Sequence, residues 1–138
     1  MKTLVMGCNG QLGHSLADTA SVNVSLIGLD LPELDITDAS AVLEICRETR
    51  PDVIINAAAY TAVDQAESES ALATSVNVEG PRNIAIASRE VGARLIHIST
   101  DFVFDGQSST PYKADAVTNP LSVYGQTKRD GELAVLEE

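Results

Sequence analysis

The chain has 138 residues, the length of a single domain, and its 44% of hydrophobic and 21% of charged residues are ordinary for a globular protein. Its formal net charge of −11 argues against a nucleic acid and against an anionic membrane surface as partners, because both attract clustered Lys and Arg. No segment approaches the roughly 20 apolar residues of a membrane span.

Short apolar runs alternate with helical patterns along the chain. Strands are predicted at residues 3–7, 24–30, 52–60 and 93–104, of which the last two lack polar alternation and are expected to be buried on both faces. Helices are predicted at about residues 11–20, at 38–50, over the stretch 66–92, and from Asn119 onward. This alternation of strands and helices indicates an α/β fold with a doubly wound parallel sheet.

Several residues mark where the predicted helices begin and end. Asp38 is expected to cap the second helix, in which Val42, Leu43, Ile45 and Cys46 form an apolar stripe, and Pro51 ends it. Pro81 indicates a kink or boundary in the long stretch 66–92. Asn119 and Pro120 are expected to be the cap and the first turn of the last helix.

The two cysteines and two histidines suggest neither a disulfide framework nor a metal site. Cys8 and Cys46 are far apart and form no CxxC motif, so a reducing cytoplasm is the expected compartment. His14 and His97 make no cluster with metal-ligand spacing, so no metal is predicted.

A glycine-rich loop, GCNGQLG, places Gly7, Gly10 and Gly13 directly after the first strand and at the opening of a helix. Such a turn brings backbone N–H groups and a helix N-terminus up to a pyrophosphate. Asp30 ends the second strand, where a carboxylate would accept hydrogen bonds from the adenosine ribose. The spacing is G-x-x-G-x-x-G rather than G-x-G-x-x-G, but the strand–loop–helix context and the acid favour a Rossmann-type dinucleotide site over a simple turn followed by a solvated Asp.

The surroundings of Asp30 indicate which dinucleotide is preferred. Its neighbours are Leu29 and Leu31, and no Arg or Lys lies nearby to hold a 2′-phosphate, which the carboxylate would repel. NADH is therefore favoured over NADPH.

Two further segments lie at or after the ends of predicted strands, where ligands bind in open α/β sheets. The small residues Ala57, Ala58 and Ala59 would let a nicotinamide approach the backbone, although a tightly packed strand end explains them equally well. The hydroxyls of Ser99 and Thr100 could hold a substrate carbonyl or merely cap the strand.

Tyr124 and Lys128 are four residues apart, which places them on one face of the predicted last helix. Tyrosine is ordinarily too weak an acid for easy proton exchange at neutral pH, but a neighbouring ammonium and an oxidised nicotinamide would favour the phenolate. Such a tyrosine could give its proton to a ketone oxygen as hydride arrives at the carbon, and recover a proton through the lysine. A tyrosine four residues before a lysine occurs often by chance. Its position after a hydroxyl pair in a predicted dinucleotide fold favours the catalytic interpretation.

Together, Tyr124-x-x-x-Lys128, Thr100 and the spaced glycines resemble the extended short-chain dehydrogenase/reductases. More closely, four stretches are similar to the dTDP-4-dehydrorhamnose reductase family: GCNGQLG, INAAAYTAVDQAE, STDFVFDG and NPLSVYGQTKRDGE. The resemblance implies reduction of the 4-keto group of a dTDP-linked deoxyhexose, dTDP-4-dehydro-L-rhamnose, to dTDP-L-rhamnose for cell-surface polysaccharide.

Carried onto matching positions, the resemblance implies a role for each residue. Tyr124 would be the acid, Lys128 its tuner and the ribose anchor, and Thr100 the hydroxyl that holds the ketone, with Asp101 beside the substrate. Besides Tyr124 and Lys128, four groups of residues would bind the cofactor. The pyrophosphate would lie against Gly7, Gly10, Gln11, Leu12 and Gly13, and the adenosine ribose against Asp30. The adenine would be flanked by Asp35 and Ile36, and the middle of the cofactor would be lined by Ala57, Ala58, Ala59, Tyr60 and Thr61.

The chain also departs from the family. Phe102 stands where some members have tyrosine. Members are about twice as long and carry a C-terminal domain that grips the nucleotide-sugar, so residues 1–138 are expected to be the dinucleotide-binding part of a longer enzyme, inactive alone. Members also tend to dimerise, which leaves a homodimer open.

Two other functions compete with the reductase. A non-catalytic dinucleotide-binding regulatory subunit is one, since the beta subunit of methionine adenosyltransferase resembles the same family, but such a subunit has no chemical reason to keep Thr100, Tyr124 and Lys128. An epimerase or dehydratase of the superfamily is the other, because those enzymes often carry an acid/base group next to the threonine, where Asp101 stands here.

Overall fold

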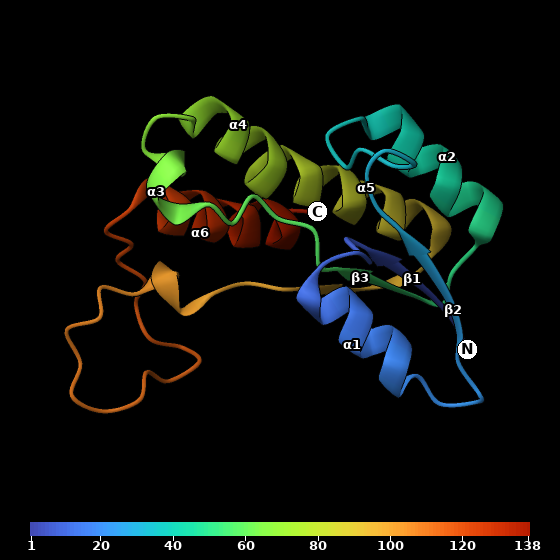
Figure 1. Cartoon of the computed structure of the whole chain (residues 1–138), viewed down its shortest axis with the longest axis horizontal. Coiled ribbons are helices and arrows are strands. Elements are labelled where there is room, and N and C mark those ends of the chain that lie inside the picture. Colours follow the sequence, from blue (N-terminus) through green and yellow to red (C-terminus); the bar gives the residue numbers. More distant parts are fainter.

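A four-stranded parallel sheet lies at the centre of the computed structural model, which describes residues 1–138 (Figure 1). The strands run in the order β2-β1-β3-β4, and each neighbouring pair is parallel. Their bounds are β1 Lys2–Met6, β2 Ser25–Leu29, β3 Val53–Asn56 and β4 Arg94–His97. Because β1 is flanked by β2 and β3 and every crossover passes through a helix, the predicted α/β doubly wound sheet is confirmed.

Helices cover both faces of this sheet, with α1 on one side and α2 and α5 on the other (Figure 1). The helical elements are α1 Gln11–Thr19, α2 Ala39–Thr49, α3 Val63–Ala66, α4 Ser70–Thr74, the π-helical segment η1 Ser75–Glu79, α5 Gly80–Val91, the 3₁₀ turn η2 Asp101–Val103, and α6 Val123–Leu136. None of these helices has the length and apolarity needed to cross a membrane.

The main hydrophobic core lies between the sheet and helices α2 and α5. Leu4, Met6 and Ile54 of the central strands pack with Val42 and Cys46 of α2, and all five are fully buried. Each such side chain stabilises the fold by about 1.5–3 kcal/mol. This core holds the strand ends, and the loops that follow them, in fixed positions.

The predicted limits of α2 are confirmed by its caps. The Asp38 carboxylate accepts hydrogen bonds from the backbone N–H groups of Ser40 and Ala41, at 2.9 and 3.0 Å. At the other end Arg50 adopts the left-handed conformation, with φ 44°, and its N–H bonds Cys46 O, after which Pro51 cannot continue the helix.

The long helical stretch predicted at residues 66–92 is not continuous. α3 ends at Ala66, α4 begins at Ser70, and the π-helical segment η1 precedes α5. From Ser70 to Val91 the helix runs without a break, and Pro81 lies in the first turn of α5 directly after the π-helical segment, so the predicted boundary is confirmed.

The predicted strands at 52–60 and 93–104 are shorter than expected, and one prediction about them is wrong. β3 ends at Asn56 and is largely buried, as predicted. β4 ends at His97 and is not buried on both faces, because it lies at the edge of the sheet and Ile96 is 45% exposed. Beyond it the chain leaves the ladder and turns into η2.

The predicted start of the last helix is also wrong by a few residues. α6 begins at Val123 and is capped by Ser122, whose hydroxyl accepts from the N–H of Gly125 at 3.1 Å. Asn119 instead donates its backbone N–H to Val103 O at 2.9 Å. This long-range contact takes Asn119 out of the cap position, and Ser122, an equally good cap, replaces it.

Candidate functional site

A groove of about 560 Å³ opens beside the C-terminal ends of β1, β2 and β3. Its volume falls in the range of small-molecule and cofactor sites. Most of the predicted cofactor residues line it: Gly7, Gly10, Gln11, Leu12, Asp30, Asp35, Ile36, Ala57, Ala58, Ala59 and Thr61. Segments that are far apart in sequence thus meet at the edge of the sheet where open α/β folds bind ligands.

The glycine loop needs its glycines for two different physical reasons. Gly7 has φ 85°, and a Cβ there would lie 2.5 Å from the backbone N of Ala58. A Cβ on Gly13 would lie 2.4 Å from Cys8 O, so α1 could not pack against the loop. A Cβ on Gly10 would meet nothing closer than Gly7 O at 3.4 Å, so its glycine leaves the opening of α1 clear rather than relieving a clash.

The N-terminus of α1 has no side chain bound to it. Gly10 occupies the N-cap position, no side chain caps the helix, and its first turn holds no acidic residue. The orphan N–H groups and the positive end of the helix dipole therefore point into the groove without a competing protein acceptor. These features fit a pyrophosphate at this position.

Asp30 holds the glycine loop in addition to facing the groove. One carboxylate oxygen accepts the N–H of Asn9 at 2.9 Å, and the other accepts the N–H of Leu31 at 2.8 Å. Each oxygen keeps a second lone pair for a ligand hydroxyl. No Lys or Arg lines the groove.

The segment after β2 is fixed to α5. Ile36 is buried and lies against Gly80, where a Cβ would come within 2.6 Å of it. Asn83 of α5 donates to the carbonyls of Ile36 and Thr37, at 3.1 and 3.2 Å. The Asp35 carboxylate accepts the N–H and the hydroxyl of Thr37, so it organises this turn as well as lining the groove.

Among residues 57–61, predicted to line the middle of the cofactor, Tyr60 is the one whose side chain turns away from the groove. Its hydroxyl donates to the carboxylate of Glu69 at 2.6 Å, and this bond raises the pKa of Tyr60. The backbone of Tyr60, by contrast, stays next to the groove-lining residues Ala59 and Thr61.

Tyr124 and Lys128 share one buried region of α6, with 9% and 3% of their surfaces exposed. The Lys128 ammonium donates to Ile98 O at 2.7 Å, just beyond the end of β4. Burial lowers the pKa of Lys128, and the charge of Glu132 partly opposes that effect. The Tyr124 ring meets the ring of Phe102 edge to face, with centroids 5.4 Å apart.

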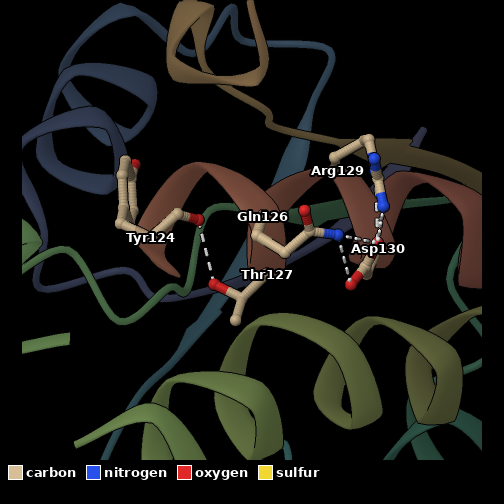
Figure 2. A network of polar contacts seen from close by, with 5 residues as sticks. All are labelled: Tyr124, Gln126, Thr127, Arg129 and Asp130. Atoms are coloured by element: carbon tan, nitrogen blue, oxygen red, sulfur yellow. Dashed lines mark hydrogen bonds and ion pairs between the residues drawn. The ribbon is translucent and has the colours of Figure 1, made fainter. Parts of the chain in front are cut away.

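α6 packs closely against η2 because Gly125 has no side chain. A Cβ there would lie 2.3 Å from the carbonyl oxygen of Phe102. Within α6 the Thr127 hydroxyl donates to Tyr124 O at 2.9 Å, while Gln126 and Asp130 pair nearby (Figure 2). The close approach brings the Tyr124 helix next to the turn that carries Thr100.

Thr100 is the N-cap of η2. Its hydroxyl accepts the N–H of Phe102 and donates to Asp101, both at 3.3 Å. Both bonds are long, so the hydroxyl can exchange the carboxylate for a ligand carbonyl at little cost. Ser99, next to it, is bound elsewhere, since its hydroxyl donates to Glu132.

Two buried asparagines, which sequence reasoning missed, connect residues at the groove to α6 and to β4. Asn77 of η1 is 1% exposed and bonds both the backbone of Tyr60 and the Thr127 hydroxyl of α6. Asn56 accepts from Ala58 N–H and contacts Nδ1 of His97, each at 3.1 Å. Burial, with the Lys128 charge, lowers the pKa of His97 to about 4, so this imidazole is neutral at pH 7.

The structure therefore builds two adjoining regions from the predicted residues. Gly13, Tyr60, Tyr124 and Lys128 do not line the groove. The apolar lining that sequence reasoning missed is Met6, Leu29, Leu31, Leu34 and Val76. Only the flanking of Asp30 by two leucines signalled part of this lining in the sequence.

The chain is similar to known proteins along its whole length. The family described as the RmlD substrate binding domain matches residues 1–138. A dTDP-4-dehydrorhamnose reductase of Streptomyces griseus is 52% identical over 137 residues, which cover 97% of this chain and 44% of that protein.

Solved structures agree with this similarity. A dTDP-4-dehydrorhamnose reductase of Clostridium acetobutylicum matches with a TM-score of 0.96 and 44% identity, over 99% of this chain and 49% of that one. The Bacillus anthracis reductase, solved in complex with NADP, matches with a TM-score of 0.96 and 42% identity, over 99% and 49%. The chain thus spans about half the length of the relatives it matches.

Proposed function

The chain belongs to the RmlD substrate binding domain family, and from this premise we propose that it binds a nicotinamide dinucleotide and carries the catalytic residues of a sugar-nucleotide reductase. The proposed reaction of the longer enzyme reduces the 4-keto group of dTDP-4-dehydro-L-rhamnose to give dTDP-L-rhamnose. The observation that carries this proposal is that the groove, with its uncapped α1 N-terminus, is joined through Asn77 to the helix α6 in which Tyr124 and Lys128 are buried.

The groove residues have separate roles toward the dinucleotide. The pyrophosphate would lie at the N-terminus of α1, where Gly10 leaves the backbone N–H groups open. Asp30 would accept the adenosine ribose hydroxyls on its free lone pairs. Ile36 and its apolar neighbours would receive the adenine, and Ala57–Ala59 would let the other half pass close to the backbone.

The proposed catalytic residues donate a proton and a hydrogen bond to the ketone oxygen. When bound, the reduced nicotinamide supplies a hydride to the ketone carbon. Tyr124 would give its phenolic proton to the ketone oxygen, while the Thr100 hydroxyl donates a hydrogen bond to the same oxygen. Lys128 has three donors, of which Ile98 O occupies one, so the others can hold the ribose and support Tyr124.

NADH is the favoured cofactor in this proposal, with NADPH as the alternative. No Lys or Arg lines the groove to pair with a 2′-phosphate, and Asp30 would repel one. The relative from Bacillus anthracis was solved with NADP, so both cofactors belong in any test. We also expect the longer enzyme to be able to form a homodimer, which sedimentation would show.

An epimerase or dehydratase is a second candidate that one observation favours. Asp101 is exposed next to Thr100 and accepts a hydrogen bond from its hydroxyl. A carboxylate at this position could act as an acid or base in such chemistry. Conversion of a sugar nucleotide without net consumption of NADH would support this candidate over the reductase.

The test is the oxidation of NADH by the full-length protein with dTDP-4-dehydro-L-rhamnose. Tyr124→Phe should lower turnover by about 10²-fold or more, while the affinity for NADH stays nearly constant, because only the transferable proton is lost. Tyr112→Phe is the matched control, since it removes a tyrosine hydroxyl that bonds Asp105 and has no role in the proposed proton transfer. Equal turnover in Tyr124→Phe and the native protein would remove Tyr124 as the acid.

A further inference from the structure

Lys128 is a buried charge with few partners. Its side chain is almost completely covered, and its ammonium donates to one backbone carbonyl, Ile98 O, at 2.7 Å. It takes part in none of the ion pairs of the structure. An ammonium removed from water in this way tends to lose its proton unless a negative charge lies near it.

Glu132 supplies a negative charge one helical turn further along α6. Residues four apart on a helix face one another, with Cβ atoms roughly 5–6 Å apart. The Glu132 carboxylate does not contact the ammonium. It accepts the hydroxyl of Ser99 instead.

Lys128 and Glu132 therefore hold the same short segment beyond β4. Lys128 binds the carbonyl of Ile98, and Glu132 binds the side chain of Ser99, the next residue. Thr100, the proposed ketone-binding hydroxyl, follows directly. Ile98 still donates its backbone N–H to Asn56 O of β3 at 3.1 Å, and the two contacts from α6 add to this bond in holding the segment that leads to Thr100.

We propose that Glu132 is a positioning residue that keeps Lys128 in its ammonium form through space and anchors Ser99 beside Thr100. This role rests on the proposed function, because Glu132 acts through Lys128 and Thr100, the two residues to which that function gives catalytic roles. One carboxylate thus couples the charge of the lysine to the placement of the substrate-binding turn.

The electrostatic balance at Lys128 agrees with this role. Burial lowers the pKa of Lys128, and the Glu132 charge is the influence that raises it. His97 faces Lys128 from β4 and is neutral at pH 7, because its own pKa is lowered to about 4. Neutral His97 therefore adds no charge.

Most other charged groups on elements packed against α6 are engaged elsewhere. The Asp64 side chain of α3 has no ion pair or hydrogen bond, and Glu90 of α5 pairs with Arg47. Glu67 accepts the N–H of Val123, and Glu79 pairs with Arg82. Arg82 and Arg89 of α5 pair with the last two glutamates of the chain, and Asp101 of η2 accepts from Thr100.

The chain allows a direct measurement of the Lys128 charge because it has only three lysines, Lys2, Lys113 and Lys128. Lysine labelled with ¹³C at Cε gives three NMR signals, and the one that Lys128→Met removes belongs to Lys128. Glu132→Gln keeps an oxygen that can accept from Ser99 but loses the charge. We expect its Lys128 titration midpoint to fall by about 1 pH unit.

Asp130→Asn is the matched control, because it removes one negative charge from the same helix. Its carboxylate binds Gln126 and Arg129 (Figure 2). The influences on the pKa of Lys128 are burial and the Glu132 charge. We expect the Lys128 midpoint to be unchanged in this variant. An unchanged midpoint in Glu132→Gln, or an equal fall in both variants, would overturn the proposal.

The proposed anchoring of Ser99 by Glu132 is tested in the full-length protein by Ser99→Ala, which keeps the Glu132 charge. We expect a several-fold loss in kcat/KM for the sugar with the alkaline limb of the pH profile unmoved, whereas Glu132→Gln shifts that limb to lower pH. Identical pH profiles for Glu132→Gln and the native protein would overturn the proposal. The NMR titration uses neither cofactor nor substrate, so a shifted midpoint without turnover would count against the reductase alone.

Discussion

The side-chain amide of Asn77 binds both backbone polar groups of Tyr60, accepting its N–H at 2.8 Å and donating to its carbonyl at 3.1 Å. The same amide nitrogen also donates to the Thr127 hydroxyl at 3.1 Å. One buried side chain therefore fixes the segment that lines the groove relative to the helix that carries Tyr124. The π-helical turn of η1 places it there, and Gly131 leaves room, since a Cβ on that residue would lie 2.1 Å from Asn77 O.

Asn77→Ala should therefore weaken both folding and cofactor binding. Removing the amide leaves the buried polar groups of Tyr60 without partners, which costs about 1–3 kcal/mol for each unsatisfied group. Urea unfolding and NADH fluorescence titration would measure the two effects. Asn119→Ala is the control, because its side-chain amide donates to Asp105, which does not line the groove, and the variant leaves Tyr60 and Thr127 joined. Equal NADH affinity in Asn77→Ala and the native protein would show that this link does not shape the groove.

The two functions of Asp30 can be separated by substitution. Asp30→Asn keeps an acceptor oxygen for the glycine loop but removes the charge, so NADPH affinity should rise relative to NADH by about tenfold, or ~1.4 kcal/mol. Asp30→Ala should lose NADH affinity as well as stability, because the N–H groups of Asn9 and Leu31 lose their acceptor. Titration with both cofactors measures the ratio. A ratio that stays constant in both variants would place the ribose away from Asp30.

Gly10 and Gly13 should respond differently to the same added methyl group. Gly13→Ala forces a Cβ to 2.4 Å from Cys8 O, so we expect a loss of about 1–3 kcal/mol in the free energy of unfolding. Gly10→Ala meets nothing closer than 3.4 Å, so the fold should tolerate it while the pyrophosphate loses its approach to the backbone. Unfolding and cofactor titrations of both variants would show this contrast. A Gly10→Ala protein with native NADH affinity would argue against a pyrophosphate at α1.

His97 should make the protein less stable as the pH falls. Its pKa is lowered from 6.5 to about 4 in the folded state, mainly by burial and also by the Lys128 charge. Between these two pH values His97 is protonated in the unfolded chain but neutral in the folded chain. The free energy of unfolding therefore decreases as the pH falls through this window. The contribution is at most ~3 kcal/mol, and partial solvent access reduces it.

His97→Gln should flatten this part of the stability–pH curve, because glutamine can accept from Asn56 but does not titrate. Urea unfolding at several pH values between 7 and about 4 is the measurement. His14→Gln is the matched control, since His14 is exposed and is the other histidine of the chain. Parallel curves for His97→Gln and His14→Gln would contradict the prediction.

Much of the cofactor region could be predicted because its signals are local. A strand, a turn with glycines at fixed spacing and a helix start lie within 13 residues, and the acid after β2 follows the same fold logic. Asp38 capped α2 as predicted, since a cap acts on N–H groups two or three residues away. The extent of β4 and the cap of α6 were mistaken because both depend on distant partners: an empty sheet edge in one case and Val103 O in the other.

The sequence by itself determined the α/β alternation, the glycine loop with its acid, and the Tyr124–Lys128 spacing, because each follows from interactions over a few residues. Tertiary structure alone decided that Asn77 would join the groove to α6, that Glu132 would bind Ser99, and that Leu34 and Val76 would line the groove. These contacts join residues separated by tens of positions. Packing of the helices on the sheet sets such distances, and no local pattern records them.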